Sequence, residues 1–218
     1  MQSLAPSHET TRPVVYVVDD DADFVDSLAT LLTGQGFEIV ACDSGANFLA
    51  MASDAKPACA LVDLKMPAMD GLQLIAAARR RGLRLPIVMM TGFGDVPRAV
   101  AAMKAGAMDF IEKPFGKDAA LAVITSVLER SRHDQRDSDR SRRFRERVDR
   151  LTQRERDVFY RMLEGKPNKI IASELNISPR TIEIHRARVF QKLEDDNVAS
   201  LLRAAIHANL LSANDRPA

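Results

Sequence analysis

Five polar residues stand at or just past the ends of short apolar runs, and their side chains suit a metal ion and a phosphoryl group. They are Asp19, Asp20, Asp63, Thr91 and Lys113. In a parallel α/β sheet the carboxyl ends of the strands meet at one edge, where ligand sites form. Carboxylates are hard oxygen ligands for Mg²⁺, and a hydroxyl and an ammonium group suit phosphoryl oxygens. The sequence therefore predicts a magnesium and phosphoryl site at one sheet edge.

Asp63 is the residue that we expect to accept a phosphoryl group. A single carboxylate at this position would be explained as a strand-end cap for the following loop. Asp19 and Asp20 bring like charges close to it, which is unfavourable unless a divalent cation lies between them. Lys113 then offers a positive charge for the phosphoryl oxygens, and Thr91 offers a hydroxyl.

The elements that must position these residues alternate between apolar strands and helical patterns. Apolar runs without polar alternation indicate strands covered on both faces, hence a parallel sheet between helices. Five strands and five helices are typical of the α/β, doubly wound, flavodoxin-like (βα)5 fold. We expect strands over 14–18, 38–42, 59–63, 87–91 and 109–113, and helices over 22–33, 46–51, 72–81, 97–105 and 117 to about 130. This first domain covers residues 13–131.

The segment 132–150 has a different composition. It contains eight Arg and five acidic residues, with Phe144 and Val148 as its apolar residues. A segment of this kind builds no core of its own. Two interpretations stay open: a solvated helical linker, which we favour, and a basic arm that touches DNA phosphates.

Residues 151–211 have a purely helical pattern, which predicts a second, smaller all-α domain. Thr152 with Glu155 is typical of a capping box, and Ser178-Pro179 of an N-cap followed by the first helical residue. Two short helices joined by a tight turn match a helix-turn-helix. The expected helices cover 155–164, 168–175, 179–193 and 197–207.

The third of these helices has an inward face and a polar face. Ile182, Val189 and Leu193 recur at helical spacing and should pack inward. The opposite face is expected to enter a DNA major groove, where Glu183 accepts from cytosine and Arg side chains bind guanine or phosphate. The DNA-contacting residues that we expect are Lys169, Arg180, Thr181, Glu183, Ile184, Arg186, Ala187 and Arg188, of which Lys169 and Arg186 serve as phosphate clamps.

Composition limits the class of protein. A length of 218 residues allows one large or two modest domains, and 46% hydrophobic residues is a globular composition. Residues 1–131 carry 12 Lys and Arg against 16 Asp and Glu, whereas residues 132–218 carry 19 against 14. An acidic half joined to a basic half fits a cation site followed by a polyanion-binding module. Cys42 and Cys59 fit small buried hydrophobic residues in a reducing compartment, and a disulfide between them is the alternative that we favour less.

No apolar stretch approaches the ~18 residues of a membrane span, and residues 1–12 lack the features of a signal peptide. We therefore expect a cytoplasmic protein.

Several motifs resemble two-component response regulators. The segments are 17–21 (VVDDD), 62–71 (VDLKMPAMDG), 90–97 (MTGFGDVP), 102–115 (AMKAGAMDFIEKPF), 151–158 (LTQRERDV) and 177–186 (ISPRTIEIHR). The first four are similar to a receiver domain, most of all to the FixJ group, and the last two to a LuxR-type (FixJ/NarL) helix-turn-helix domain. The resemblance implies that Asp63 is the phosphoacceptor and that Asp19, Asp20 and Asp63 hold Mg²⁺ with the backbone carbonyl of Lys65. It also implies that Thr91 and Lys113 contact the phosphoryl group and that Phe110 is an aromatic switch.

The same resemblance implies partners: a sensor histidine kinase, double-stranded DNA, RNA polymerase and a second copy of the chain. The face that dimerises on phosphorylation would include Val100, Met103 and Lys104; Met103 could instead fill the core. Phe93 departs from the FixJ pattern, which has His there, and we expect this ring to alter the lifetime of the acyl phosphate.

The leading interpretation is a DNA-binding response regulator, not an enzyme, that is phosphorylated on Asp63 by its kinase, dimerises and regulates transcription. The alternative is an Mg²⁺-dependent aspartyl-phosphate phosphatase or phosphotransferase. That alternative is weaker because Lys65, rather than a second carboxylate, stands two residues beyond Asp63. A nucleotide-binding module is not favoured, because this sequence has no Gly-rich loop after the first expected strand. A pure protein-interaction module would require that the basic C-terminal helices do not bind DNA.

Overall fold

The structure is a computed structural model that describes residues 12–92 and 96–211. The chain divides into two compact units, with the boundary between His133 and Asp134.

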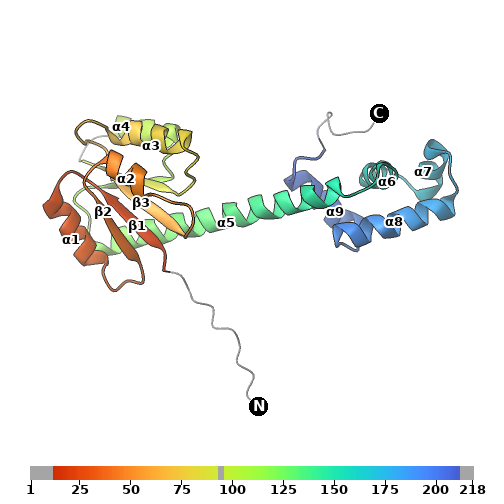
Figure 1. Ribbon diagram of the computed structural model, residues 1–218, viewed down its shortest axis with the longest axis horizontal. Helices are drawn as coiled ribbons and strands as arrows, with labels where there is room; N and C mark the ends of the chain where they lie inside the picture. Colours follow the sequence, from red (N-terminus) through yellow and green to blue (C-terminus); the bar gives the residue numbers. More distant parts are fainter. Residues whose placement is uncertain (1–11, 93–95, 212–218) are drawn as a thin grey trace, which may run out of the picture. The chain divides into compact units, whose positions relative to one another are not determined.

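The first unit is built on a five-stranded parallel sheet (Figure 1). Its strand order is β2-β1-β3-β4-β5, the doubly wound flavodoxin-like order that the sequence predicts. The strands are β1 (Val14–Val18), β2 (Glu38–Cys42), β3 (Ala58–Asp63), β4 (Ile87–Thr91) and β5 (Asp109–Glu112). All five residues of β1 and of β4 are buried, as expected for strands covered on both faces.

Helices cover both faces of this sheet. On one face, α1 (Ala22–Leu32) and the first part of α5 (Lys117–Asp149) pack against the side chains of Val15 and Val17. On the other, α2 (Gly45–Met51), α3 (Gly71–Arg80) and α4 (Val96–Ala105) pack against the side that includes Tyr16. Cys42 and Cys59 are buried free thiols in these two cores, as expected, and burial raises the pKa of Cys59 to about 12.

Helix α5 (Lys117–Asp149) is much longer than the sequence pattern predicts. The expected end near Arg130 is wrong, because the helix continues through the charged segment. The first part buries Ile124 and Val127 in the core of the first unit. The last part buries Phe144 and Val148 in the core of the second unit.

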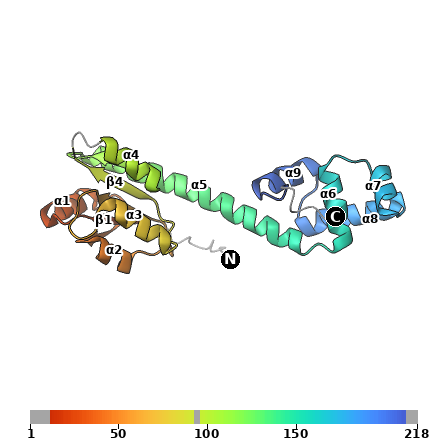
Figure 2. The ribbon, with the colours of Figure 1, turned by 90° about the horizontal axis from the view of Figure 1, so that it is seen from above.

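The second unit is all-helical, with α6 (Gln153–Leu163), α7 (Asn168–Leu175), α8 (Pro179–Leu193) and α9 (Val198–His207) around one core (Figure 2). The capping box at Thr152 and the N-cap at Ser178 form as predicted. Helix α7 ends at Asn176, which has a left-handed backbone (φ 53°, ψ 45°) and makes the tight turn before α8. Among the described residues, no helix is long and apolar enough to cross a membrane.

Candidate functional site

Two carboxylates meet because their strands are neighbours in register. Val18 of β1 pairs with Val62 of β3, so the residues that follow, Asp19 and Asp63, emerge side by side at the carboxyl edge of the sheet. Asp19 is 3% exposed, and its Oδ1 accepts the backbone N–H of Asp21 at 3.1 Å. The prediction that these residues gather at one sheet edge is therefore met by the strand pairing.

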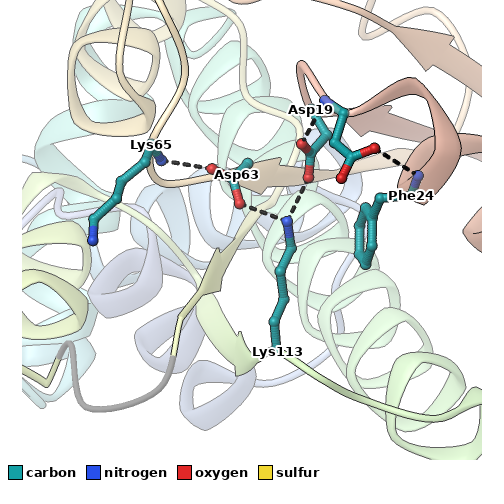
Figure 3. A network of polar contacts seen from close by, with 6 residues as sticks. Asp19, Phe24, Asp63, Lys65 and Lys113 are labelled. Carbon is teal, nitrogen blue, oxygen red and sulfur yellow. Dashed lines mark hydrogen bonds and ion pairs between the residues drawn. The ribbon is translucent and has the colours of Figure 1, made fainter.

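Lys113 reaches both carboxylates from the end of β5 (Figure 3). Its Nζ donates to Asp19 Oδ2 at 2.5 Å and to Asp63 Oδ1 at 2.7 Å. Burial disfavours the ammonium, but the hydrogen bonds to the two carboxylates outweigh this effect and raise the pKa of Lys113. The lysine therefore stays charged and offsets much of the repulsion between the carboxylates.

The second oxygen of Asp63 is held by the backbone. Asp63 Oδ2 accepts the N–H of Lys65 at 2.7 Å (Figure 3). Lys113 on one oxygen and the Lys65 amide on the other fix the plane of the carboxylate. The side chain of Asp63 is partly accessible, so an incoming group can reach it.

Three carboxylates at this edge are arranged so that one cation can bind them together. One oxygen from each of Asp19, Asp20 and Asp63 lies within 4.8 Å of the other two. Asp20 is exposed, whereas Asp19 is buried. Hard oxygen donors at this spacing fit Mg²⁺, which commonly keeps several waters and takes few protein carboxylates.

Thr91 and Phe110 lie on neighbouring strands beside the site. Thr91 ends β4 and is 3% exposed, whereas the ring of Phe110 on β5 is 48% exposed. A largely apolar cavity of about 390 Å³ is lined by Thr91, Phe110, Val100 and Met103, among others. Space therefore exists between the buried hydroxyl and the outward-facing ring.

The face of α4 is exposed. Val100 is 48% and Met103 43% exposed, and Lys104 is also exposed. The alternative that Met103 fills the core is therefore wrong. Phe93, where the sequence departs from the FixJ pattern, lies outside the described residues.

Helix α8 separates its two faces as its sequence predicts. Ile182, Val189 and Leu193 are fully or almost fully buried. The exposed face holds most of the predicted DNA-contacting side chains: Arg180, Glu183, Ile184, Ala187 and Arg188. Lys169 on α7 is exposed as well.

Two of the predicted DNA contacts also have partners within the protein. Thr181 Oγ1 lies 2.8 Å from Ser178 Oγ at the N-cap of α8. The guanidinium of Arg186 lies 5.9 Å from the ring centroid of Phe190. His185 is partly buried, and its Nδ1 has no hydrogen-bond partner among the described residues.

The start of α6 is tied to the end of α8 by a buried carboxylate. Glu155 is 3% exposed, and its Oε2 accepts the N–H of Thr152 at 2.8 Å and the Nζ of Lys192 at 2.6 Å. Burial opposes ionisation of Glu155, but these hydrogen bonds prevail and lower its pKa. The link fixes the carboxyl end of the helix that presents the exposed basic face.

Side chains near the end of α5 hold the carboxyl ends of two other helices. Arg147 Nη1 donates to Leu193 O at 2.7 Å, and Arg145 Nε donates to Ala208 O at 2.7 Å. Helix-terminal carbonyls lack partners within their own helix, and a cation there also suits the helix dipole. These arginines therefore act as structural caps for the second unit.

The sequence reasoning missed one residue at the phosphoryl site. Phe24, in the first turn of α1, places its ring 3.9 Å from Lys113 Nζ, measured to the ring centroid. The signal in the sequence is slight, since it is an aromatic residue a few positions after the Asp19–Asp21 run.

A receiver-like α/β domain followed by a helix-turn-helix is the class of protein that this fold and these sites define. A family model described as the response regulator receiver domain matches residues 15–125, and one described as bacterial regulatory proteins, luxR family, matches residues 149–208. The transcriptional regulatory protein FixJ of Bradyrhizobium diazoefficiens is 39% identical over 203 residues, which cover 93% of this chain and 99% of that protein.

Solved structures agree with this assignment. The response regulator StyR has a TM-score of 0.77 and 34% identity, with 90% of this chain and 99% of that chain covered. Full-length FixJ from B. japonicum has a TM-score of 0.58 and 39% identity, with 93% and 100% covered. The chain belongs to the FixJ-like response regulators, with a receiver domain and a LuxR-type DNA-binding domain. It is thus a transcription regulator, and the phosphatase or phosphotransferase alternative is not favoured.

Proposed function

We propose that this regulator is switched by phosphorylation of Asp63 by a sensor histidine kinase, and that the phosphorylated form dimerises and binds DNA. The observation that supports this most strongly is the contact between Asp63 Oδ1 and Lys113 Nζ at 2.7 Å beside the buried Asp19. A carboxylate held between a lysine and a backbone amide is oriented to act as a nucleophile.

The proposed transfer is a simple displacement at phosphorus. A carboxylate oxygen of Asp63 forms a P–O bond while the P–N bond of a phosphohistidine in the kinase breaks. The leaving imidazole keeps the electron pair and takes up a proton. Lys113 stays protonated throughout and places its charge against the phosphoryl oxygens, where charge develops.

We infer that Asp19, Asp20 and Asp63 hold Mg²⁺ together with the backbone carbonyl of Lys65. The spacing of the carboxylate oxygens, all within 4.8 Å, supports this assignment. When bound, the ion supplies positive charge against the phosphoryl oxygens. The residues themselves orient the acceptor: Lys65 N–H holds one oxygen of Asp63, and Asp19 anchors Lys113.

We propose that Thr91 and Phe110 couple phosphorylation of Asp63 to the exposed face of α4. Once the phosphoryl group is present, the hydroxyl of Thr91 moves to contact it, and the ring of Phe110 turns from its 48% exposed position into the adjoining cavity. The exposed side chains of Val100, Met103 and Lys104 then form the face that pairs with a second copy.

The proposed DNA contacts come from the exposed face of α8. Ile184 is 48% exposed at the middle of this face, where an apolar side chain can contact a thymine methyl group. Glu183 accepts from a cytosine amino group, and Arg180 and Arg188 bind guanine edges or phosphates. Lys169 and Arg186 clamp phosphates, and Thr181 holds the start of the helix.

In this proposal residues 13–131 are the phosphoacceptor domain, 132–150 the linker and 151–211 the DNA-binding domain of a cytoplasmic regulator. Dimers would bind a two-fold related site and act on RNA polymerase.

The test is treatment of the full chain with acetyl phosphate or BeF₃⁻ and Mg²⁺, followed by measurement of molecular mass and DNA affinity. We expect the wild type to dimerise and bind DNA more tightly, and Asp63→Ala to do neither. Asp43→Asn is the matched control, since this exposed carboxylate follows β2 at the same sheet edge. Dimerisation and tighter DNA binding by Asp63→Ala would contradict the assignment. Loss of these two responses in Asp43→Asn would contradict it as well.

A further inference from the structure

The ammonium group of Lys113 lies between two carboxylates and the ring of Phe24 (Figure 3). The ring centroid of Phe24 is 3.9 Å from Nζ, and Asp19 and Asp63 accept hydrogen bonds from the same atom. This distance is well within the ~6 Å range of a cation–π interaction. The Lys113 side chain is 23% exposed, so the ring contacts a partly desolvated charge, where this interaction is strongest.

The ring of Phe24 is itself held in place. Its backbone N–H donates to Asp21 Oδ1 at 3.1 Å, which is the N-cap bond of α1. Phe115 meets it edge-on, with centroids 6.0 Å apart and an interplanar angle of 88°. A ring that is fixed by the helix start and by a second ring can restrain the long, flexible lysine chain.

A restraint from the ring matters most when the carboxylates change partners. In the unphosphorylated structure the hydrogen bonds to Asp19 and Asp63 are sufficient to hold the ammonium of Lys113 in place. Once Asp63 carries a phosphoryl group, its carboxylate has become an acyl phosphate (a mixed anhydride) and no longer offers a carboxylate charge to the ammonium. The ring of Phe24 is unchanged by these events, so it keeps the ammonium at the site while the lysine exchanges one anionic partner for another.

We propose that Phe24 is a positioning residue for phosphoryl transfer, which acts by holding the Lys113 ammonium over the acceptor. This inference rests on the proposed phosphorylation of Asp63. The simpler account is that Phe24 only fills space, since it packs against the apolar core beneath α1. The two accounts differ in what the ring must be: a space-filler can be aliphatic, whereas a cation–π partner must be aromatic.

The experiment uses the full chain and compares Phe24→Leu with Phe24→Tyr. Phosphorylation by acetyl phosphate with Mg²⁺ should be about three- to tenfold slower in Phe24→Leu and close to wild type in Phe24→Tyr, because the latter keeps the aromatic face. Phe115→Leu is the matched control: it removes the edge-on neighbour but leaves the Phe24 ring on Lys113, so its rate should fall less than that of Phe24→Leu.

A second readout does not depend on transfer. The ε-methylene protons of Lys113 should show an upfield ring-current shift by NMR in the wild type and in Phe24→Tyr, and should lose it in Phe24→Leu. The shift should persist after BeF₃⁻ is added with Mg²⁺. Equal rates for Leu and Tyr, or a shift that vanishes with BeF₃⁻, would overturn the inference. If the wild type itself is not phosphorylated, the proposed function fails instead, and that result is seen before any Phe24 variant is compared.

Discussion

The buried carboxylate of Glu155 offers a quantitative test of what holds the DNA-binding unit together. Glu155→Gln keeps the shape of the side chain but removes the charge that accepts from Thr152 N at 2.8 Å and from Lys192 Nζ at 2.6 Å. A hydrogen bond to a charged group contributes about 1.5–3 kcal/mol. Because Lys192 is 37% exposed and Gln retains an acceptor oxygen, we expect a loss near the lower limit, about 1.5 kcal/mol. For a unit of this size that loss lowers Tm by about 6–12 °C.

Tyrosine fluorescence gives an assay for this unit alone. The chain has two Tyr and no Trp, so a Tyr16→Phe background leaves Tyr160, which lies in the core of the second unit. Thermal and urea unfolding followed at Tyr160 then report the second unit. Adding Lys192→Met in a double-mutant cycle isolates the pair, with an expected coupling of about 1 kcal/mol.

The pH dependence of stability gives a result that could refute this reasoning. The pKa of Glu155 is lowered in the folded protein, so its contribution is fully present above the unfolded value near 4.5 and is lost as the pH falls through the folded pKa. The stability difference between wild type and Glu155→Gln should therefore be constant near neutral pH and shrink in acid. A stability difference that grows below pH 4.5, or a neutral-pH Tm lowered by less than about 2 °C relative to wild type, would refute the reasoning.

Three further outcomes follow from other contacts in the two units. A Cβ at Gly71 would lie 2.7 Å from the backbone oxygen of Asp63, so Gly71→Ala should displace the acceptor and slow acetyl-phosphate transfer about tenfold or more in a folded chain. Phe144→Ala should destabilise the second unit by about 3–5 kcal/mol in the fluorescence assay while leaving Mg²⁺ binding unchanged, because this ring is 5% exposed in that core. Lys113→Met should tighten Mg²⁺ binding measured by calorimetry, since the ammonium that competes for Asp19 is gone, and should also slow transfer.

The sheet and its site were predictable because both follow from patterns within single segments. Unbroken apolar runs define buried parallel strands, and the carboxyl ends of such strands share an edge. The pairing of Val18 with Val62 then brings Asp19 and Asp63 together, as their positions in the sequence imply. The capping box at Thr152 was equally predictable, because all of its members lie within one turn.

Contacts between distant segments were not predictable in the same way. Phe24 lies in the first turn of α1 and Lys113 follows β5, and their contact depends on side-chain conformations that no local pattern records. The identity of the phosphoryl site could be inferred without this ring, since the carboxylates and lysine already define its charge. The position of the Phe24 ring beside Lys113 could not be inferred in this way.

Helix α5 shows how tertiary contacts override composition. Its charged middle has few apolar side chains, so the sequence pattern places the end of the fifth helix near Arg130 and favours a solvated helical linker over 132–150. The structure instead anchors the helix at both ends: Ile124 is fully buried in one core, and Phe144 is 5% exposed in the other. An ion pair between Arg142 and Asp139, one turn apart at 3.0 Å, adds only a little stability because both side chains are exposed. Burial of apolar side chains at both ends therefore stabilises this long helix.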